Sequence, residues 1–150
     1  MKIFFPGSFN PFTKGHADIL ERLLGFAQNV TIGIGRNADK AFEAAASDKN
    51  KKAIEDYISR NGLSERVDVV VYDGLTAEEA LSHGADCMAR GVRNSSDYEL
   101  ESSLAAANRK AFGIDTILIP ADPKFSFVSS SMIRDLENHG RKDIAQNFIP

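Results

Sequence analysis

The sequence predicts an α/β protein with one domain, residues 1–150, built on a doubly wound, five-stranded parallel sheet. Two observations lead to this prediction: short apolar segments alternate with longer segments of helical periodicity, and glycines follow the helical segments. A chain of 150 residues is long enough to bury one core, and it contains no repeat and no low-complexity linker.

Five segments are predicted to be strands because they are short, mostly apolar and rich in Val and Ile, as strands covered on both faces are. Helical segments separate them, so consecutive strands need crossover connections and the sheet is expected to be parallel, in a Rossmann-like arrangement. The predicted strands are Lys2–Phe5, Val30–Gly35, Val67–Tyr72, Ala85–Ala89 and Thr116–Pro120.

Five segments show the apolar spacing of amphipathic helices. In the first, Ile19, Leu20 and Leu23 form a stripe that would face the sheet. The predicted helices are His16–Phe26, Asp48–Asn61, Thr76–His83, Ser96–Phe112 and Ser130–Asn138.

A glycine lies at or just beyond the end of each predicted helix, where a residue in the left-handed conformation often closes the last turn. These glycines are Gly25, Gly62, Gly84, Gly113 and Gly140. The segment Ala41–Asn50 shows no clear pattern and is predicted to be a loop.

Composition limits the possible partners. The net charge of −3 gives no general attraction to nucleic acid or to an anionic membrane, so neither is expected as a partner and any anion site must be local. The single cysteine, Cys87, excludes an internal disulfide, fits a reducing, cytoplasmic compartment and is expected in the core. No apolar run has the roughly 20 residues of a membrane span, and Pro6-Gly7 cuts the first apolar stretch too early for a signal peptide.

The turn Pro6–His16 is the strongest functional signal in the chain. It joins the first strand to the first helix, so its free N–H groups and the helix N-terminus converge on one spot that suits a phosphate. In Thr13-x-Gly15-His16, the imidazole reaches the same spot and can hydrogen-bond phosphate oxygens. Alone, a histidine there would more often cap or pack the helix start.

Four polar regions follow predicted strands, where ligands bind in sheets of this kind. Arg90 and Arg93 flank Gly91, and guanidinium groups suit phosphate; the alternative, two surface arginines, is unusual at the end of a buried apolar strand. Ser129-Ser130-Ser131 are expected to form a helix N-cap and first turn. The four regions are Pro6–His16, Arg36–Lys40, Arg90–Arg93 and Pro120–Ser131, and together they predict an active site.

The segment Thr13-x-Gly15-His16 resembles the first signature of the nucleotidylyltransferase superfamily. Two later segments resemble the bacterial phosphopantetheine adenylyltransferases within it: Arg90-Gly91-Val92-Arg93, followed by Asp97-Tyr98-Glu99 and Asn108-Arg109, and the segment from Ser126 to Arg134. The resemblance extends from Lys2 to Pro150.

The resemblance implies transfer of an adenylyl group from ATP to 4′-phosphopantetheine, which gives dephospho-coenzyme A and pyrophosphate. The attacking phosphate is already ionised, so positioning and electrostatics suffice without a general base or a covalent intermediate. Mg²⁺ is expected on the ATP phosphates, with no dedicated protein cage. The resemblance also implies a homohexamer and feedback by coenzyme A.

The resemblance assigns site residues by position. His16 would stabilise the transition state, Lys40 would contact both reacting phosphates, and Arg90 would grip the acceptor phosphate. The implied ATP-binding residues are Ser8, Phe9, His16, Gly91, Val92, Arg93, Glu101, Phe125, Ser126, Phe127, Val128, Ser129, Ser130 and Ser131. The implied phosphopantetheine-binding residues are Ser8, Lys40, Thr76, Arg90, Leu104 and Asn108.

Several assignments have alternatives. Arg36 could share the role of Lys40, and Glu99 could replace Glu101. Thr76 could be a helix N-cap, Leu104 a core residue and Arg134 a phosphate ligand or a surface residue.

The sequence also departs from the family pattern. Ser8 and Asn10 stand where the family more often has Thr and Asp, Phe125 stands where it often has Trp, and the residues from Phe42 to Lys49 differ from the usual helix start. Serine keeps the hydroxyl, whereas Asn10 is expected to be a turn former. Other readings are a nucleotidylyltransferase for nicotinamide mononucleotide or glycerol phosphate, and a non-catalytic nucleotide-binding module.

Overall fold

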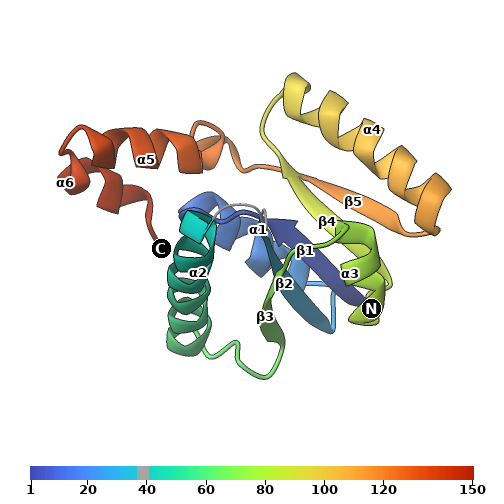
Figure 1. The fold of residues 1–150 in the computed structure, drawn as a ribbon. Helices are drawn as coiled ribbons and strands as arrows, with labels where there is room; N and C mark the ends of the chain where they lie inside the picture. Colours follow the sequence, from blue (N-terminus) through green and yellow to red (C-terminus); the bar gives the residue numbers. More distant parts are fainter. Residues whose placement is uncertain (37–40) are drawn as a thin grey trace.

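The computed structural model describes residues 1–36 and 41–150, without the side chains of residues 41–43. Its centre is a five-stranded sheet in the order β3-β2-β1-β4-β5, in which every pair is parallel. Figure 1 shows the helices arranged around this sheet. The strands are β1 (Lys2–Gly7), β2 (Asn29–Gly35), β3 (Val67–Tyr72), β4 (Cys87–Val92) and β5 (Asp115–Pro120). The predicted fold class is confirmed.

Alternate residues of β1 supply two separate cores. Ile3 and Phe5 pack with α1 (Lys14–Leu24) and α2 (Ala41–Arg60) on one face of the sheet. Phe4 packs on the other face with α3 (Thr76–Ser82) and with the end of α4 (Ser95–Phe112). Helices therefore cover both faces, as a doubly wound sheet requires. Cys87 is buried in the first core, as predicted.

The strand order reverses between β1 and β4, and this is where such sheets bind ligands. The pairing of β1 with β4 comprises only Ile3 with Cys87 and Phe4 with Met88, although both strands continue further. The carboxyl-terminal residues of β1 and β4 are therefore available to line a site.

The chain after β5 forms a small separate layer. It contains the 3₁₀ turn Pro123–Phe125, α5 (Ser130–Asn138), α6 (Lys142–Ala145) and the 3₁₀ turn Gln146–Phe148. Val128, Ile133 and Ala145 form its core. Figure 1 shows α5 and α6 extending to one side of the sheet, away from α4. This layer brings the predicted serine segment to the edge of the sheet where β1 ends.

The predicted loop Ala41–Asn50 is wrong, because α2 begins at Ala41. The inward positions in this part of α2 are Ser47 and Asn50, which are 5% and 7% exposed. One turn and two turns further on, the buried positions are Ile54 and Tyr57, which are apolar. From Ser47 onward the helix therefore has a buried face, but polar residues occupy the first part of that face and hide the period from a hydrophobicity pattern.

Gly25 is also an exception. Gly62, Gly84, Gly113 and Gly140 have φ between 67° and 74°, as predicted, whereas Gly25 has φ −66°. The N–H of Gly25 donates to the carbonyl of Arg22, so the chain continues the helical turn after α1 and needs no left-handed residue there.

Two element boundaries affect the site. β4 was predicted to end at Ala89 but continues to Val92, so Arg90 and Gly91 lie inside the strand and only Arg93 follows it. α1 was predicted to begin at His16 but begins at Lys14. His16 is therefore the third residue of the helix. In the described residues, no helix combines the length and the apolar character needed to cross a membrane.

Candidate active site

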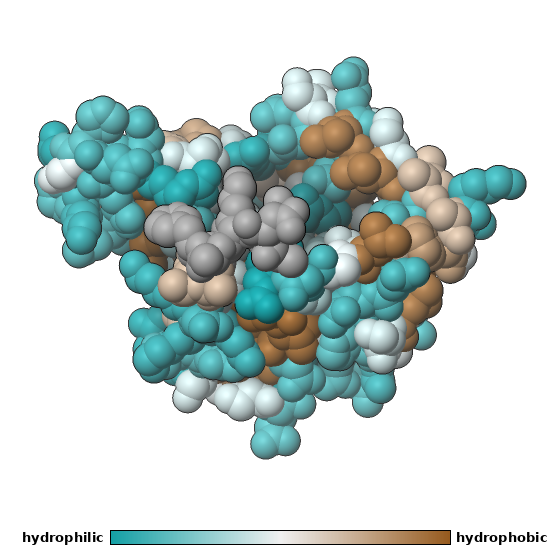
Figure 2. All heavy atoms as spheres, viewed as in Figure 1, coloured by the Kyte–Doolittle hydropathy of each residue, from teal (hydrophilic) through white to brown (hydrophobic). Residues whose placement is uncertain are grey.

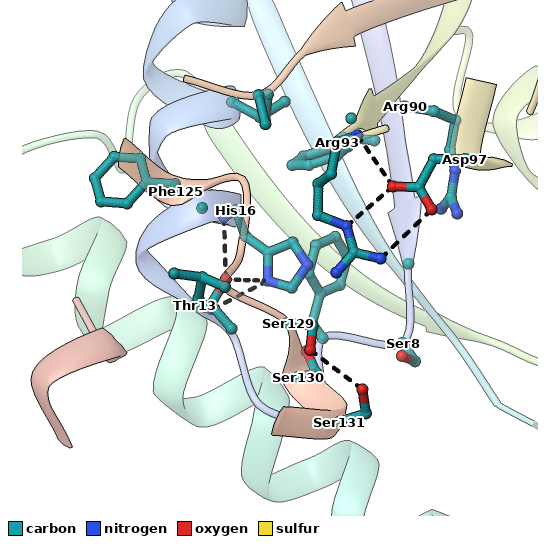
Figure 3. A pocket seen from close by; sticks show the side chains of 18 of the residues that line it. Ser8, Thr13, His16, Arg90, Arg93, Asp97, Phe125, Ser129, Ser130 and Ser131 are labelled. Atoms are coloured by element: carbon teal, nitrogen blue, oxygen red, sulfur yellow. Dashed lines mark hydrogen bonds and ion pairs between the residues drawn. The ribbon is translucent and has the colours of Figure 1, made fainter. Parts of the chain in front are cut away.

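Two pockets adjoin at the carboxyl-terminal ends of β1 and β4. The first has a volume of about 340 Å³ and collects residues from β1, α1, β4, α4 and the segment that precedes and opens α5. Figure 3 shows how these elements direct their side chains toward one another. Its lining residues include Ser8, Phe9, Thr13, Gly15, His16, Arg90, Gly91, Arg93, Asp97, Glu101, Phe125, Val128, Ser129, Ser130, Ser131 and Arg134.

His16 is held by a capping box at the start of α1. Its backbone N–H donates to Oγ1 of the N-cap residue Thr13 over 3.3 Å, and the backbone N–H of Thr13 donates to Nδ1 of His16 over 3.0 Å. A backbone N–H can only donate, so Nδ1 must accept. The neutral ring therefore carries its proton on Nε2.

Burial, followed by the positive charges of Arg90 and Arg93, lowers the pKa of His16 to about 4. The rings of Phe9 and Phe12 lie against the imidazole, at centroid distances of 4.9 Å and 5.7 Å. His16 is therefore a neutral hydrogen-bond donor near neutral pH.

Phe9 is buried and has φ 47°, a left-handed conformation that costs a bulky residue free energy. Its ring lies so close to Gly7 that a Cβ atom there would be 3.0 Å from it. Phe9 therefore contributes to the pocket mainly as the wall that supports the His16 ring.

Arg90 is fixed by two partners. Its Nε and Nη2 donate to the two carboxylate oxygens of Glu101 over 3.0 Å and 2.7 Å, and its Nη1 donates to the carbonyl of Pro6. Glu101 is 8% exposed. This is the bidentate arrangement in which a guanidinium is held most firmly.

Arg93 forms a similar pair with Asp97, four residues later. Its Nε donates to Oδ2 of Asp97 over 3.0 Å, and these hydrogen bonds lower the pKa of the Asp97 carboxyl. Figure 3 shows this pair at the edge of the pocket. Asp97 has no role in the sequence-based site, although the Arg-x-x-x-Asp spacing at a helix start could have identified it.

The serine segment forms the predicted cap. Ser129 is the N-cap of α5 and accepts from the N–H of Met132, and Ser130 donates to the carbonyl of Pro11 over 2.8 Å. Ser131 lies 3.2 Å from Ser129, oxygen to oxygen. The first turn of α5 thus presents hydroxyl and N–H groups to the first pocket.

Some residues of the predicted ATP site do not line either pocket. Phe127 is 60% exposed and packs against Phe148, and Ser126 donates to the carbonyl of Pro123. Val92 is buried in β4. Phe125, Val128 and the three serines do line the first pocket.

The second pocket, of about 380 Å³, lies between α3 and α4 and is more apolar. Leu104 is 49% exposed, so it is a wall of the groove and not a core residue. Thr76 is not the N-cap of α3, which is Leu75; its hydroxyl is 2.9 Å from the hydroxyl of Tyr72. Figure 2 shows apolar side chains gathered between α3 and α4. The lining includes Ser8, Tyr72, Leu75, Thr76, Met88, Arg90, Glu101, Leu104, Asn108, Phe112 and Thr116.

The two pockets share one wall, made of Pro6, Gly7, Ser8, Arg90 and Glu101. Ser8 is exposed on this wall. A ligand group between the two pockets would therefore meet Arg90 and the hydroxyl of Ser8.

Lys40 lies outside the described residues. Arg36, the alternative for its role, pairs with Asp73 at 2.5 Å and 3.0 Å and lines neither pocket. Arg134 does line the first pocket and donates to the carbonyl of Asn10. Within residues 1–36 and 41–150, no group of three or more His, Cys, Asp or Glu side chains could hold a metal ion.

Comparison with known proteins shows the family to which this chain belongs. The cytidylyltransferase-like family model matches residues 4–136. A phosphopantetheine adenylyltransferase of Porphyromonas gingivalis is 41% identical over 146 residues, which are 97% of this chain and 92% of the relative. That of Bacteroides thetaiotaomicron is 40% identical over 149 residues, 99% of this chain and 95% of the relative. This chain belongs to the phosphopantetheine adenylyltransferase family. The family predicted from the sequence and the predicted enzyme class, a nucleotidyltransferase, are confirmed.

Solved structures support the fold of this family member. A bifunctional NMN adenylyltransferase/ADP ribose pyrophosphatase from Francisella tularensis is 18% identical with a TM-score of 0.68, covering 93% of this chain and 42% of that one. The chain thus spans less than half of the Francisella protein. A Plasmodium falciparum nicotinic acid mononucleotide adenylyltransferase is 16% identical with a TM-score of 0.60, covering 99% and 89%. These likenesses show the fold alone.

Proposed function

We propose that the two adjoining pockets are the ATP and acceptor subsites through which this chain transfers an adenylyl group from ATP to 4′-phosphopantetheine. One observation carries the proposal: a polar pocket suited to phosphates and a more apolar groove share a wall that contains Arg90. Phosphopantetheine has the matching form, with a phosphate at one end of a long, weakly polar arm. The reaction belongs to the biosynthesis of coenzyme A.

The first pocket suits ATP. Arg93 and the first turn of α5 offer N–H and hydroxyl groups to the triphosphate. Nε2–H of His16 can donate to an oxygen on the α-phosphate. These groups are fixed by Asp97, Thr13 and the Ser129 cap before a ligand arrives, so little reorganisation is needed.

The second pocket suits the pantetheine arm. Leu75 and Leu104 form apolar walls at its mouth, and Asn108 and Thr76 provide polar groups for the amides of the arm. A phosphate placed at the shared wall would reach Arg90 and Ser8. In this arrangement the acceptor phosphate would lie next to the α-phosphate of ATP.

The chemistry is a displacement at the α-phosphorus. An oxygen of the phosphopantetheine phosphate forms a bond to that phosphorus, the bond to the bridging oxygen breaks, and pyrophosphate leaves with the electron pair. Negative charge grows on the α-phosphate oxygens in the five-coordinate transition state. His16, held as a neutral Nε2–H donor, stabilises that charge without transferring a proton.

Mg²⁺ is part of the proposal as a companion of ATP. The acids that line the first pocket are Asp97 and Glu101, and both are paired with arginines. The residues present therefore suit an ion held by phosphate oxygens and water, not by a protein cage. When bound, the ion would neutralise charge on the triphosphate and on the departing pyrophosphate.

The remaining parts of the proposal rest on the family resemblance. Lys40 would contact both reacting phosphates. Coenzyme A would act as a feedback ligand, since it contains the same pantetheine arm. The chain would work in the cytoplasm as a homohexamer, and exposed apolar residues on α4, Tyr98 and Leu100, would suit a subunit contact.

The test is pyrophosphate release from ATP and Mg²⁺ with 4′-phosphopantetheine as acceptor. Nicotinamide mononucleotide and glycerol 3-phosphate serve as competing acceptors. We expect pyrophosphate release when phosphopantetheine is the acceptor and not when either of the other two compounds is. Pyrophosphate release only with another acceptor would overturn the assignment of the substrate but not of the fold. Binding of ATP with no pyrophosphate release in the presence of any of these acceptors would support a non-catalytic module.

A further inference from the structure

We propose that Thr116 is an acceptor-binding residue, whose hydroxyl hydrogen-bonds the first amide of the pantetheine arm. Thr116 has no role in the site that the sequence predicts. The inference rests on the proposed function for the identity of the acceptor, and it adds to that function a polar contact on the floor of the second pocket.

The hydroxyl of Thr116 is buried without a partner. Among the side chains that the structure describes, its Oγ1 is the one buried nitrogen or oxygen atom that forms no hydrogen bond. Such a group costs about 1–3 kcal/mol of stability. Valine has the same shape, suits a strand equally well and would avoid this cost. The position of Thr116 in β5 therefore does not explain its hydroxyl, whereas a partner that arrives with a ligand would.

Thr116 faces the second pocket. Ile117 packs on the first core, and successive side chains of a strand point to opposite faces, so Thr116 points to the face that α4 covers (Figure 1). Thr116 pairs with Met88 of β4, and both residues line the pocket. A change of rotamer exchanges the hydroxyl and the methyl group of a threonine. The residue can therefore turn its hydroxyl to the pocket without moving the backbone.

The spacing between Thr116 and Arg90 matches the acceptor. Met88, the partner of Thr116, precedes Arg90 by two residues on β4, so Thr116 lies about 7 Å from Arg90 along the strand direction. In 4′-phosphopantetheine about six bonds separate the phosphorus from the nitrogen of the first amide, a span of about 7 Å when extended. A phosphate at Arg90 would bring that amide level with Thr116.

The pocket makes this hydrogen bond valuable to the ligand as well. Met88, Ala105 and Phe112, which also line the pocket, are apolar. An amide that enters an apolar groove loses its hydrogen bonds to water, and this is costly unless a protein group replaces them. A hydroxyl both donates and accepts, so it can pair with the N–H or the carbonyl of the amide. Each partner would satisfy a group that the other leaves unpaired.

The deciding variant is Thr116→Val, which keeps the shape and loses the hydroxyl. It should raise both the KM and the calorimetric Kd for phosphopantetheine by about fivefold, and leave those for ATP within about twofold. Its melting temperature should be unchanged or higher, because no unpaired hydroxyl is buried any longer. Thr116→Ser keeps the hydroxyl and should bind phosphopantetheine within about twofold of the wild type.

Thr31→Val is the matched control. It makes the same change in β2, at a residue that lines neither of the two pockets, and should alter neither substrate's KM. A change in the ligand completes the test: in an analogue of phosphopantetheine, two methylene groups replace the first amide. The wild type and Thr116→Val should bind this analogue with the same Kd, because the hydroxyl has lost its partner.

Three results with Thr116→Val would overturn the inference. They are an unchanged Kd for phosphopantetheine, a rise for ATP alone, and an equal loss of both substrates with a lower melting temperature, which would show that the hydroxyl stabilises the fold. A loss of affinity for the analogue as large as that for phosphopantetheine would also overturn it. If the wild-type protein does not use phosphopantetheine, the proposed function fails and this inference with it. If the wild type does use it and Thr116→Val is unaffected, the inference alone fails.

Discussion

The backbone N–H of Thr13 donates to Nδ1 of His16 over 3.0 Å, and this bond sets which nitrogen of the ring carries the proton. Oγ1 of Thr13 lies 3.2 Å from the same nitrogen and also accepts from the N–H of His16. The residue that caps α1 thus also fixes the donor that faces the first pocket. The helix cap and the proposed catalytic donor therefore belong to one hydrogen-bonded unit.

Thr13→Val should separate these effects. Valine keeps the backbone N–H and the shape but loses the hydroxyl, so the protein should lose about 1 kcal/mol of stability with the cap. The His16 ring would keep one of its two contacts, and kcat should fall several-fold with little change in either KM. Thr13→Ser, which keeps the hydroxyl, should retain most of kcat. A change in KM for ATP without a change in kcat would contradict this role.

The lowered pKa of His16 predicts how stability depends on pH. The folded pKa is about 4 and the unfolded value is about 6.5, so between these values the unfolded chain binds more protons. Stability should therefore rise with pH across this window, by about 3 kcal/mol from this group, and be lost as pH falls from 6.5 toward 4. Denaturant unfolding from pH 4 to 7 checks it, with His16→Asn as the reference. An equally steep pH dependence in His16→Asn would contradict the prediction.

Gly7→Ala tests the support beneath His16. The added Cβ would be 3.0 Å from the Phe9 ring, which packs on the imidazole. Overpacking of this kind costs about 1–3 kcal/mol, and kcat should fall as the His16 ring is displaced. Gly74→Ala is the matched control, because among the described residues no atom outside its neighbours lies within 4 Å of a Cβ there. Equal effects of the two substitutions on kcat would contradict the prediction.

Leu104→Ala tests the assignment of the second pocket. Leu104 is half exposed in the groove, so shortening it should cost little stability. Lost apolar contact with the pantetheine arm should raise the KM for phosphopantetheine by roughly tenfold, with the KM for ATP unchanged. Steady-state kinetics with each substrate varied would show this. A selective effect on ATP would instead place the nucleotide in the second pocket.

Much of the fold and of the site could be predicted from the sequence, because the signals were local. Apolar runs gave the strands, and the parallel order then brought His16, Arg93 and the serine segment to one edge. The start of α2 could not be found this way, because Ser47 and Asn50 occupy its buried face. The end of β4 was missed because a charged residue usually ends an apolar strand, whereas Arg90 continues it with its charge paired to Glu101.

The partners of the site residues could not be predicted either. Whether Glu101 meets Arg90, or Asp97 meets Arg93, depends on how α4 is placed against the end of β4. Packing of the whole domain decides that placement, and although the four-residue spacing of Arg93 and Asp97 could have indicated their pair, no such spacing indicates the pair of Arg90 and Glu101. The sequence predicts which side chains bind phosphate, and the structure adds which residues hold those side chains in place.

The central claim is that Arg93 binds ATP in the first pocket, whereas Arg90, at the wall shared by the two pockets, binds the acceptor phosphate. Calorimetric titration of Arg90→Ala and Arg93→Ala, each with ATP and with 4′-phosphopantetheine, tests it most directly. Arg90→Ala should raise the Kd for phosphopantetheine by about tenfold or more and the Kd for ATP by less than about threefold. Arg93→Ala should have the reverse effect on the two Kd values. Equal losses of both ligands in both variants, or the opposite pairing, would contradict the account.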